Sequence, residues 1–299
     1  MSALVDLHRH LDGSLRLATV HEIASDLGLS VPEDLCFTPG MGLMEALSRF
    51  EFTLSLLQGP AAVARVADEM CQDAMAEGTQ VLEIRFAPQL HRGANISRIV
   101  DAALEGIADR AGLILCGLYG EPPSVLDALV DSAEHRRGVV GIDLAGGPAP
   151  GAEYGMVDYI PAFKRARSLG IGRTVHAGEG RPVDEIRFAV DHLYAQRIGH
   201  GVPLLDDEAL VERVIERGIT IEACPTSNWQ TGIIETVADH PIRSWIARGV
   251  SVNINTDNTL LSQVDLPAEI ARTAAQCGLS PLEIEYTLDC GRRAAFGRE

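Results

Sequence analysis

Long apolar runs are missing from this sequence of 299 residues. No stretch reaches the roughly 18 consecutive apolar residues that a membrane-spanning helix needs. The first residues also lack the basic region, the apolar region and the cleavage site of a secretory leader. These absences argue against a membrane protein and against a secreted one, and we expect a cytoplasmic protein.

The spacing of the six cysteines does not indicate a metal site or a set of disulfides. None of them forms the C-x-x-C pair of a thiolate zinc site, and their scatter does not resemble a disulfide framework. We therefore predict buried free thiols at Cys36, Cys71, Cys116, Cys224, Cys277 and Cys290.

Basic residues are scarce as well. The chain has 42 acidic against 25 basic residues, and its net charge of -17 repels polyanions within a Debye length. Nucleic acid is therefore not an expected partner. Hydrophobic residues make up 46% and charged residues 22%, which is typical of a globular protein. Lys164 is the only lysine.

Short runs rich in Val, Ile and Leu alternate with helical patterns along the whole chain. This alternation predicts βα units and a parallel sheet, and eight such runs favour a closed (β/α)8 TIM barrel. The predicted strands lie near residues 3–8, 80–87, 112–118, 139–144, 172–176, 196–200, 218–223 and 250–256. An open doubly wound sheet is the alternative, but the Gly-rich turn that binds dinucleotides does not follow the first strand.

About seventy residues separate the first two predicted strands, far more than one crossover helix needs. Apolar residues at helical spacing predict a helix over 41–57, and Pro60 opens a second helix that runs to about Glu77. We interpret the first as a lid over the barrel mouth and the second as a barrel-packing helix. The prediction is one barrel domain over 1–299, with a helical lid insertion at about 18–77.

Gly146 to Gly151 form the strongest Gly/Pro cluster. A domain linker is one interpretation of such a cluster. Because the cluster directly follows a strand and precedes a helix, we favour a βα loop at the barrel mouth. The sequence contains no internal repeat and no low-complexity tract.

Metal-binding residue types stand at the ends of several predicted strands. His8 and His10 are two apart, so in a strand both imidazoles point to the same face. His176, His200 and Asp257 each close a further run, and the carboxyl ends of barrel strands converge on one site. One such histidine alone is more often a packed or surface residue. Their coincidence, together with Glu179, predicts a metal centre.

Three neutral imidazoles and a carboxylate suit Zn²⁺, although iron or cobalt could also be held. Zinc lowers the pKa of a bound water to about 7, which provides a nucleophile for hydrolysis. Glu179, three residues past His176, is our candidate general acid, and a helix-start glutamate is the alternative role. His200 is either a base or a fourth imidazole ligand, and spacing does not separate the two.

The lysine content bears on the number of metal ions. A bridged two-metal site in this architecture uses a carbamylated lysine on a barrel strand. Lys164 falls in a predicted helix over Asp158 to Leu169. We therefore predict one zinc ion per chain.

Six short segments carry the candidate site residues and their neighbours, in order from the first predicted strand to the last. They are His8-x-His10-Leu11-Asp12-Gly13, Gly141-Ile142-Asp143-Leu144-Ala145-Gly146, His176-Ala177-Gly178-Glu179, Ile198-Gly199-His200-Gly201, Cys224-Pro225-Thr226-Ser227-Asn228 and Asn255-Thr256-Asp257. Together these segments resemble those of the adenosine and adenine deaminase group of the amidohydrolase superfamily. The H-x-E and P-C-x-x-C signature of the cytidine-type zinc deaminases is absent.

The resemblance implies a role for each residue of the site. It implies zinc ligands at His8, His10, His176 and Asp257. His200 would orient the attacking water and stabilise the charge formed at C6, and Glu179 would protonate purine N1. The backbone of Gly146 would meet N3, and Asp12 would meet the ribose 5′-hydroxyl. A turn residue before Gly13 is the alternative role for Asp12.

Asn258 departs from the family pattern, which often has a second aspartate at this position that meets purine N7. N7 only accepts hydrogen bonds, so an aspartate must be protonated to donate to it, whereas an amide donates at any pH. Asn258 is therefore compatible with a purine and is a third substrate-binding candidate.

The resemblance implies a zinc-dependent hydrolase that converts adenosine and 2′-deoxyadenosine to the inosine products and ammonia. Its partner would be a small-molecule purine nucleoside. One alternative is a deaminase of another 6-aminopurine, such as adenine or a modified adenosine. Another is a catalytically silent nucleoside-binding protein. The sequence contains no signal for an oligomeric state.

Overall fold

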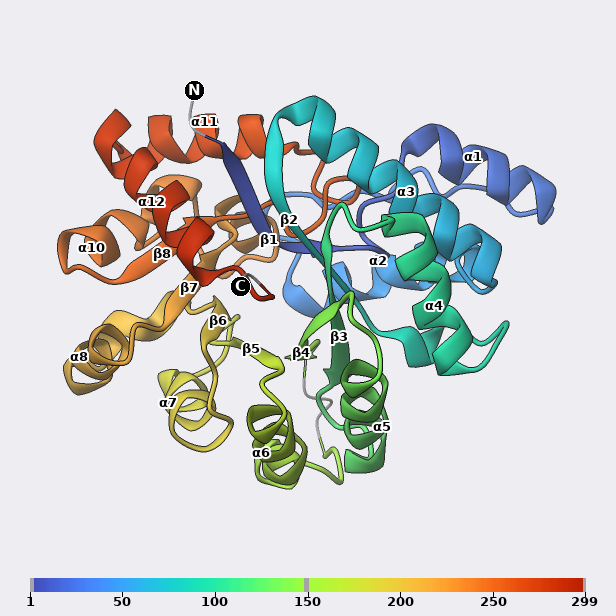
Figure 1. Cartoon of the computed structure of the whole chain (residues 1–299). Coiled ribbons are helices and arrows are strands. Elements are labelled where there is room, and N and C mark those ends of the chain that lie inside the picture. Colours follow the sequence, from blue (N-terminus) through green and yellow to red (C-terminus); the bar gives the residue numbers. More distant parts are fainter. Residues whose placement is uncertain (1–2, 148–150, 298–299) are drawn as a thin grey trace.

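Eight parallel strands form the centre of the molecule and follow one another in sequence order from β1 to β8 (Figure 1). The structure, a computed structural model, describes residues 3–147 and 151–297. Backbone hydrogen bonds from His10 to Asp257 and from Asp257 to His8, both 2.8 Å, join the last strand to the first. The predicted (β/α)8 barrel is confirmed.

Every predicted strand is present, with ends that differ from the prediction by a few residues. The strands are β1 (Leu4–His10), β2 (Thr79–Phe86), β3 (Gly112–Leu118), β4 (Val139–Ala145), β5 (Gly172–Ala177), β6 (Arg197–His200), β7 (Thr220–Ala223) and β8 (Ser251–Ile254). Most of their residues are buried on both faces of the sheet, which is why they form apolar runs in the sequence.

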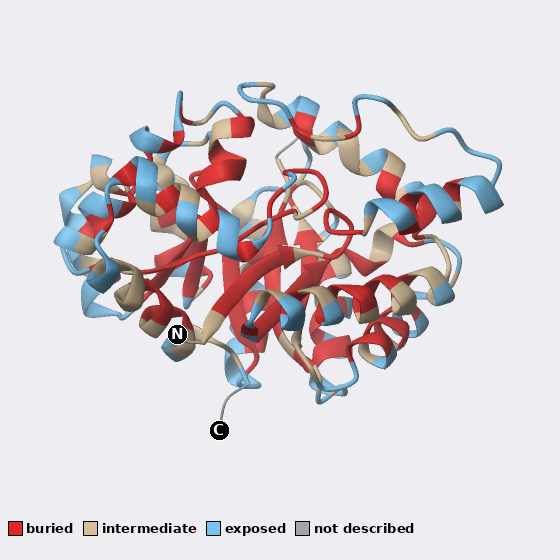
Figure 2. Ribbon diagram, turned by 90° about the horizontal axis from the view of Figure 1, so that it is seen from above, coloured by how far each residue is buried: buried red, intermediate tan, exposed pale blue. Residues whose placement is uncertain are grey.

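Helices surround the strands, and their outer faces carry the exposed residues (Figure 2). They are α1 (Leu17–Asp26), α2 (Leu43–Leu56), α3 (Pro60–Glu77), α4 (Ile96–Ile107), α5 (Pro123–Glu134), α6 (Ile160–Ser168), α7 (Val183–His192), α8 (Glu208–Glu216), α9 (Pro225–Gln230), α10 (Ile242–Ala247), α11 (Leu266–Cys277) and α12 (Pro281–Ala294). Short 3₁₀ turns are η1 (Pro88–Leu90), η2 (Met156–Tyr159), η3 (Val202–Asp206) and η4 (Val237–Asp239). Among the described residues, no helix has the length and apolar character needed to span a membrane.

Side-chain caps fix the starts of several helices. Asn95, Asp207 and Asp265 each accept a hydrogen bond from a backbone N–H in the first turn of α4, α8 and α11. Ser280 and Glu283 form a reciprocal capping box at the start of α12. Such caps satisfy N–H groups that the helix itself leaves without partners.

The segment between β1 and β2 holds α1, α2 and α3. The helix predicted over 41–57 is α2, and the helix predicted from Pro60 is α3. α3 packs against α4 and β2, as expected of a barrel helix. The division of the chain into one domain with a lid insertion stays a prediction.

Two other predicted segments lie between β4 and β5. Lys164 lies in α6, which begins at Ile160, two residues later than predicted, because residues 156–159 form the 3₁₀ turn η2. Gly146 and Gly147 follow β4 directly, as expected for a βα loop. Residues 148–150 of the same predicted loop lie outside the described residues.

The end of the chain closes the amino-terminal side of the barrel. α12 packs against β1, β7 and β8, and the tail that follows it lies over the ring of strands in Figure 1. The Phe296 ring sits so close to Gly141 and Gly172 that an added Cβ would approach it to 2.9 and 2.4 Å. These two positions therefore need glycine. Arg197 covers the ring, with 3.7 Å between the guanidinium carbon and the ring centroid.

Candidate active site

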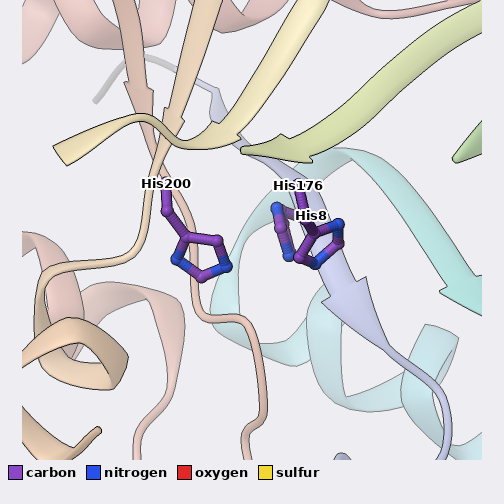
Figure 3. Close-up of side chains that lie close together, drawn as sticks. All are labelled: His8, His176 and His200. Carbon is purple, nitrogen blue, oxygen red and sulfur yellow. The ribbon is translucent and has the colours of Figure 1, made fainter. Parts of the chain in front are cut away.

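The four predicted metal ligands meet at the carboxyl ends of the strands. Nε2 of His10 lies 3.2 Å from Nε2 of His8 and 3.2 Å from Nε2 of His176. Oδ1 of Asp257 lies 3.6 and 3.4 Å from Nε2 of His8 and His10. Figure 3 shows the imidazole of His200 beside those of His8 and His176.

Two of these residues have backbone torsions that are unusual for a side chain with a Cβ. His200 and Asp257 adopt φ angles of 65° and 61°, in the left-handed region. Such a conformation costs on the order of 1 kcal/mol or more and persists only where the surroundings impose it. His200 is the last residue of β6, and Asp257 lies three residues after β8, so both stand where the chain leaves its strand.

Carboxylates contact the Nδ1 atoms of two of the imidazoles, on the side away from the other ligands. Nδ1 of His8 lies 2.8 Å from Oε2 of Glu222, and Nδ1 of His176 lies 3.0 Å from Oδ2 of Asp143. Because a carboxylate accepts hydrogen bonds, Nδ1 of each ring carries the proton, and Nε2 presents its lone pair to the cavity. Nitrogen lone pairs only 3.2 Å apart repel each other unless a cation lies among them. The donor set therefore fits a metal ion.

Arginines bind these carboxylates inside the barrel. Arg85 donates to Asp143 and to Glu222 at 2.8 Å each, so it connects the partners of His8 and His176. Arg197 donates through Nη2 to Glu83 at 2.5 Å, and its Nε lies 2.7 Å from Oε1 of Glu222 in an ion pair. The exposed fraction of these five side chains is at most 3%. Buried charges need such partners, since an unpaired one is strongly destabilising.

Burial and these charges shift the pKa values of the site. Burial lowers the pKa of His8 and His10, and it lowers that of His200 to about 3. Burial opposes protonation of His176 too, but the Asp143 carboxylate outweighs it and raises the His176 pKa. Burial raises the pKa of Glu179. Burial thus favours the neutral form of His8, His10 and His200, in which a ring nitrogen keeps a free lone pair.

Glu179 and His200 face each other across the site. Nε2 of His200 lies 3.6 Å from Oε1 of Glu179. The Asn228 amide nitrogen donates to Nδ1 of His200 at 3.0 Å, which leaves the proton of the neutral ring on Nε2. Gly178 and Gly180, on either side of Glu179, both have positive φ angles, so the turn that presents this carboxyl depends on glycine.

A narrow cavity opens beside these groups. Its lining combines predicted site residues with apolar side chains from α2 and the segment before it, and with Ser227 and Thr231. The lining residues are His10, Phe37, Leu43, Ala46, Leu47, Phe50, Gly146, His176, Glu179, His200, Ser227, Thr231, Asp257 and Asn258. Among the described residues, this lining contains no arginine and no lysine.

The remaining substrate-binding candidates differ in their placement. Gly146 and Asn258 line the cavity, whereas Asp12 does not. Asp12 lies in a turn with Gly13, and burial raises its pKa to about 7. Its Oδ1 and the Oδ1 of Asn258 are buried, and neither has a hydrogen-bond partner among the described residues. The Asn258 side chain packs against Gly13, where an added Cβ would lie 1.9 Å from Oδ1.

Several residues that shape the site carried no predicted role. Asp143 and Asn228 stood in the quoted segments, but their contacts were not anticipated. Glu222 and Arg85 were missed entirely, although each is a charged residue within a predicted strand, which was a usable signal. Cys224 is a further potential donor, since its sulfur lies within 4.8 Å of ligand atoms of His200 and Asp257.

Comparison with known proteins gives matches along the whole chain. The sequence model of the adenosine deaminase family matches residues 3–297. An adenosine deaminase of Erwinia tasmaniensis is 32% identical over 98% of this chain and 93% of the relative. A relative from Dictyostelium discoideum is 35% identical over 88% of this chain, which spans 36% of that relative's length.

Solved structures share the fold. An adenine deaminase from Arthrobacter aurescens superposes with a TM-score of 0.87 at 24% identity, covering 100% of this chain and 95% of the other. An amidohydrolase from Burkholderia ambifaria with bound Zn superposes with a TM-score of 0.87 at 24% identity. The match covers 98% of this chain and 85% of the other. The N6-methyl-AMP deaminase of Arabidopsis thaliana superposes with a TM-score of 0.86 at 24% identity. The match covers 99% of this chain and 92% of the other. At such identities the likeness concerns the fold alone.

Proposed function

The chain belongs to the adenosine deaminase family of metal-dependent hydrolases, and we propose that it uses one zinc ion to deaminate adenosine and 2′-deoxyadenosine. The products would be inosine or 2′-deoxyinosine and ammonia. The observation that carries the proposal is the convergence of His8, His10, His176 and Asp257 beside Glu179 and His200.

His8, His10, His176 and Asp257 are the residues that would hold the zinc ion. Their facing lone pairs and the carboxylates behind His8 and His176 support this assignment. When bound, Zn²⁺ acts as a Lewis acid that activates water at neutral pH. His200 also faces this region. Because Asn228 donates to its Nδ1 and the ring proton lies on Nε2, we assign His200 to orienting the water and not to binding the metal.

Glu179 and His200 would carry the proton chemistry. Burial raises the pKa of Glu179, which favours the protonated form that a general acid needs to protonate purine N1. Protonation of N1 lets the ring accept electrons while water attacks C6. His200, held at Nδ1 by Asn228, would orient that water through Nε2 and stabilise the charge that develops at C6.

The cavity lining favours a nucleoside over a nucleotide. A phosphate group is usually bound by arginine or lysine side chains, and neither residue type lines the described cavity. The apolar side chains of Phe37, Leu47 and Phe50 suit a flat purine ring. We propose that α2, which contributes Leu47 and Phe50, acts as the lid.

Two polar side chains would select the nucleoside. Asn258 lines the cavity, and its amide would donate to purine N7. Asp12 has an unpartnered buried oxygen, which would accept a hydrogen bond from the ribose 5′-hydroxyl. Free adenine, the main alternative substrate, has no ribose and would leave Asp12 unsatisfied. The placement of Asp12 outside the cavity lining is the observation that favours adenine.

A substrate panel tests the proposal. The zinc-loaded protein is mixed with adenosine, 2′-deoxyadenosine, adenine and AMP, and ammonia release is measured together with the ultraviolet spectrum. We expect the highest kcat/KM for the two nucleosides, with AMP at least about 100-fold lower because its phosphate finds no basic partner. A preference for adenine or AMP would overturn the substrate assignment. If none of the four compounds releases ammonia, the proposed deaminase activity is overturned.

A further inference from the structure

A second hollow lies at the other end of the barrel, where β5, β6, β7 and β8 begin. It has a volume of about 930 Å³, which is within the usual range for small-molecule sites. We call it the basal groove. It is lined by Arg167, Arg173, Val190, Asp191, Tyr194, Ala195, Gln196, Arg217, Gly218, Ile219, Thr220, Gly249, Ser251, Tyr286, Arg293, Ala294, Ala295 and Phe296.

Positive charge gathers on the walls of the basal groove. Four arginines line it, whereas Asp191 is its only acidic lining residue in the described chain. That carboxylate is already shared by Arg217, at 3.2 Å, and by Arg213. The concentration of arginine is unusual in a chain of net charge -17. The lining of the groove thus carries more positive than negative side chains, in contrast to the chain as a whole.

Three of the four arginines form no ion pair with a carboxylate of residues 3–147 and 151–297. Most arginines in the described chain form ion pairs, but Arg167, Arg173 and Arg293 contact no carboxylate among the residues described. Arg167 lies over the ring of Tyr194, 4.5 Å from its centroid. Arg293 donates to the sulfur of Cys290 at 3.3 Å. Both guanidinium groups thus keep free donors beside the groove.

Arg173 is the buried member of the set, with an exposed fraction of 9%. It donates through Nε to the carbonyl of Tyr194 at 3.0 Å and through Nη1 to that of Ile171 at 2.6 Å. Nη2 is in no hydrogen bond with the described residues. Burial lowers the pKa of Arg173, and repulsion from Arg167 adds to this shift. A bound anion would oppose this shift, because its negative charge stabilises the charged guanidinium group.

The backbone at Tyr194 shapes one wall of the basal groove. Tyr194 follows the end of α7 and has a φ angle of 55°, in the left-handed region. Glycine usually occupies such a position after a helix, because other residues are strained there. Here the strained conformation turns the tyrosine carbonyl to Arg173 and its ring to Arg167. Both contacts hold the arginines in place.

We propose that the basal groove binds a small phosphorylated anion. Guanidinium groups on several walls suit an anion with more than one charge and several acceptor oxygens, which a phosphoryl group provides. Tyr194, Tyr286 and Phe296 also border the groove and offer apolar surface to an organic group attached to that phosphate. The ligand class is therefore a phosphomonoester, with inorganic phosphate as its minimal form.

Titration calorimetry at low ionic strength tests this proposal. The zinc-loaded protein is titrated with inorganic phosphate, with glucose 6-phosphate and with succinate, a dicarboxylate of similar charge. We expect one phosphate or phosphate ester per chain, tighter binding of the ester than of free phosphate, and much weaker binding of succinate. Equal affinity for succinate would overturn the phosphate assignment, and no binding of either phosphate compound would overturn the site.

Exposed arginines provide variants that should fold normally. Arg167→Gln combined with Arg293→Gln should weaken phosphate binding at least tenfold and leave deamination unchanged, because both residues lie far from the catalytic end. Arg98→Gln is the matched control, since it removes the same charge from an exposed arginine of α4 that pairs with Glu105. Unchanged binding in the double variant, or an equal loss in the control, would contradict the proposal. This outcome is independent of whether the enzyme deaminates adenosine.

Discussion

Asp143 holds the imidazole of His176 through a contact of 3.0 Å between Oδ2 and Nδ1. Arg85 holds the same carboxylate at 2.8 Å. The lone pair of His176 Nε2 therefore faces the other ligands in one fixed orientation. We predict that Asp143→Asn lowers zinc affinity about 10- to 100-fold, the usual effect of losing a carboxylate behind a histidine ligand. Competition with a chelator measures this affinity.

A surface carboxylate provides the control for that variant. Asp101 pairs with Arg136 at 2.7 Å and is 45% exposed. Asp101→Asn makes the same chemical change away from the site and should leave zinc affinity unchanged. Circular dichroism checks that both variants are folded. Normal zinc affinity in folded Asp143→Asn would show that this carboxylate does not position the ligand.

Glu179→Gln separates proton transfer from metal binding. The amide keeps the shape of the side chain but cannot donate an acidic proton to N1. We expect a loss of about 10²- to 10⁴-fold in kcat, the usual contribution of general acid catalysis, with normal zinc content. Glu185→Gln changes a nearby glutamate that pairs with Arg181 and should retain most of the activity. Unimpaired turnover in Glu179→Gln would remove this residue from its role.

Asn258→Asp should introduce a pH dependence that the natural chain lacks. The new carboxyl would be buried next to Asp257, so both burial and charge repulsion would raise its pKa. It would donate to N7 only while protonated, so kcat/KM should fall as the pH rises between about 6 and 9. Asn258→Ala should lose activity equally at every pH. A pH profile of Asn258→Asp parallel to that of the natural chain would contradict the N7 contact.

Phe296→Ala should destabilise the protein without changing its chemistry. The variant removes a half-buried ring that packs on Gly141 and Gly172 and lies under Arg197. We expect the free energy of unfolding to fall by about 2 kcal/mol, somewhat less than for a fully buried phenylalanine. Denaturant unfolding measures the loss. Leu282, which is 83% exposed, provides the control variant Leu282→Ala, and an equal loss there would refute the role of Phe296.

The barrel was predictable because its strands are buried on both faces. Burial on both faces produces short apolar runs, and the alternation of these runs with helical patterns indicates the (β/α)8 order. The helix that became α2 was predictable from its apolar spacing. The start of α6 was placed too early, because a 3₁₀ turn and a helix leave a similar pattern of apolar residues in the sequence.

The metal-ligand residues were predictable from their positions at strand ends, whereas their supporting contacts were not. Arg85 connects residues from β2, β4 and β7, and no spacing along the chain encodes such a contact. The barrel must close before these side chains meet. The same holds for the basal groove, whose arginines come from separate elements and carry no motif.

Zinc titration of metal-free protein, with adenosine turnover as the readout, tests the central claim most directly. The account predicts no turnover without metal, a linear rise in rate with added zinc, and a plateau at one zinc ion per chain. Full turnover in chelator-treated protein, a plateau at two zinc ions per chain, or no turnover at any zinc content would contradict it.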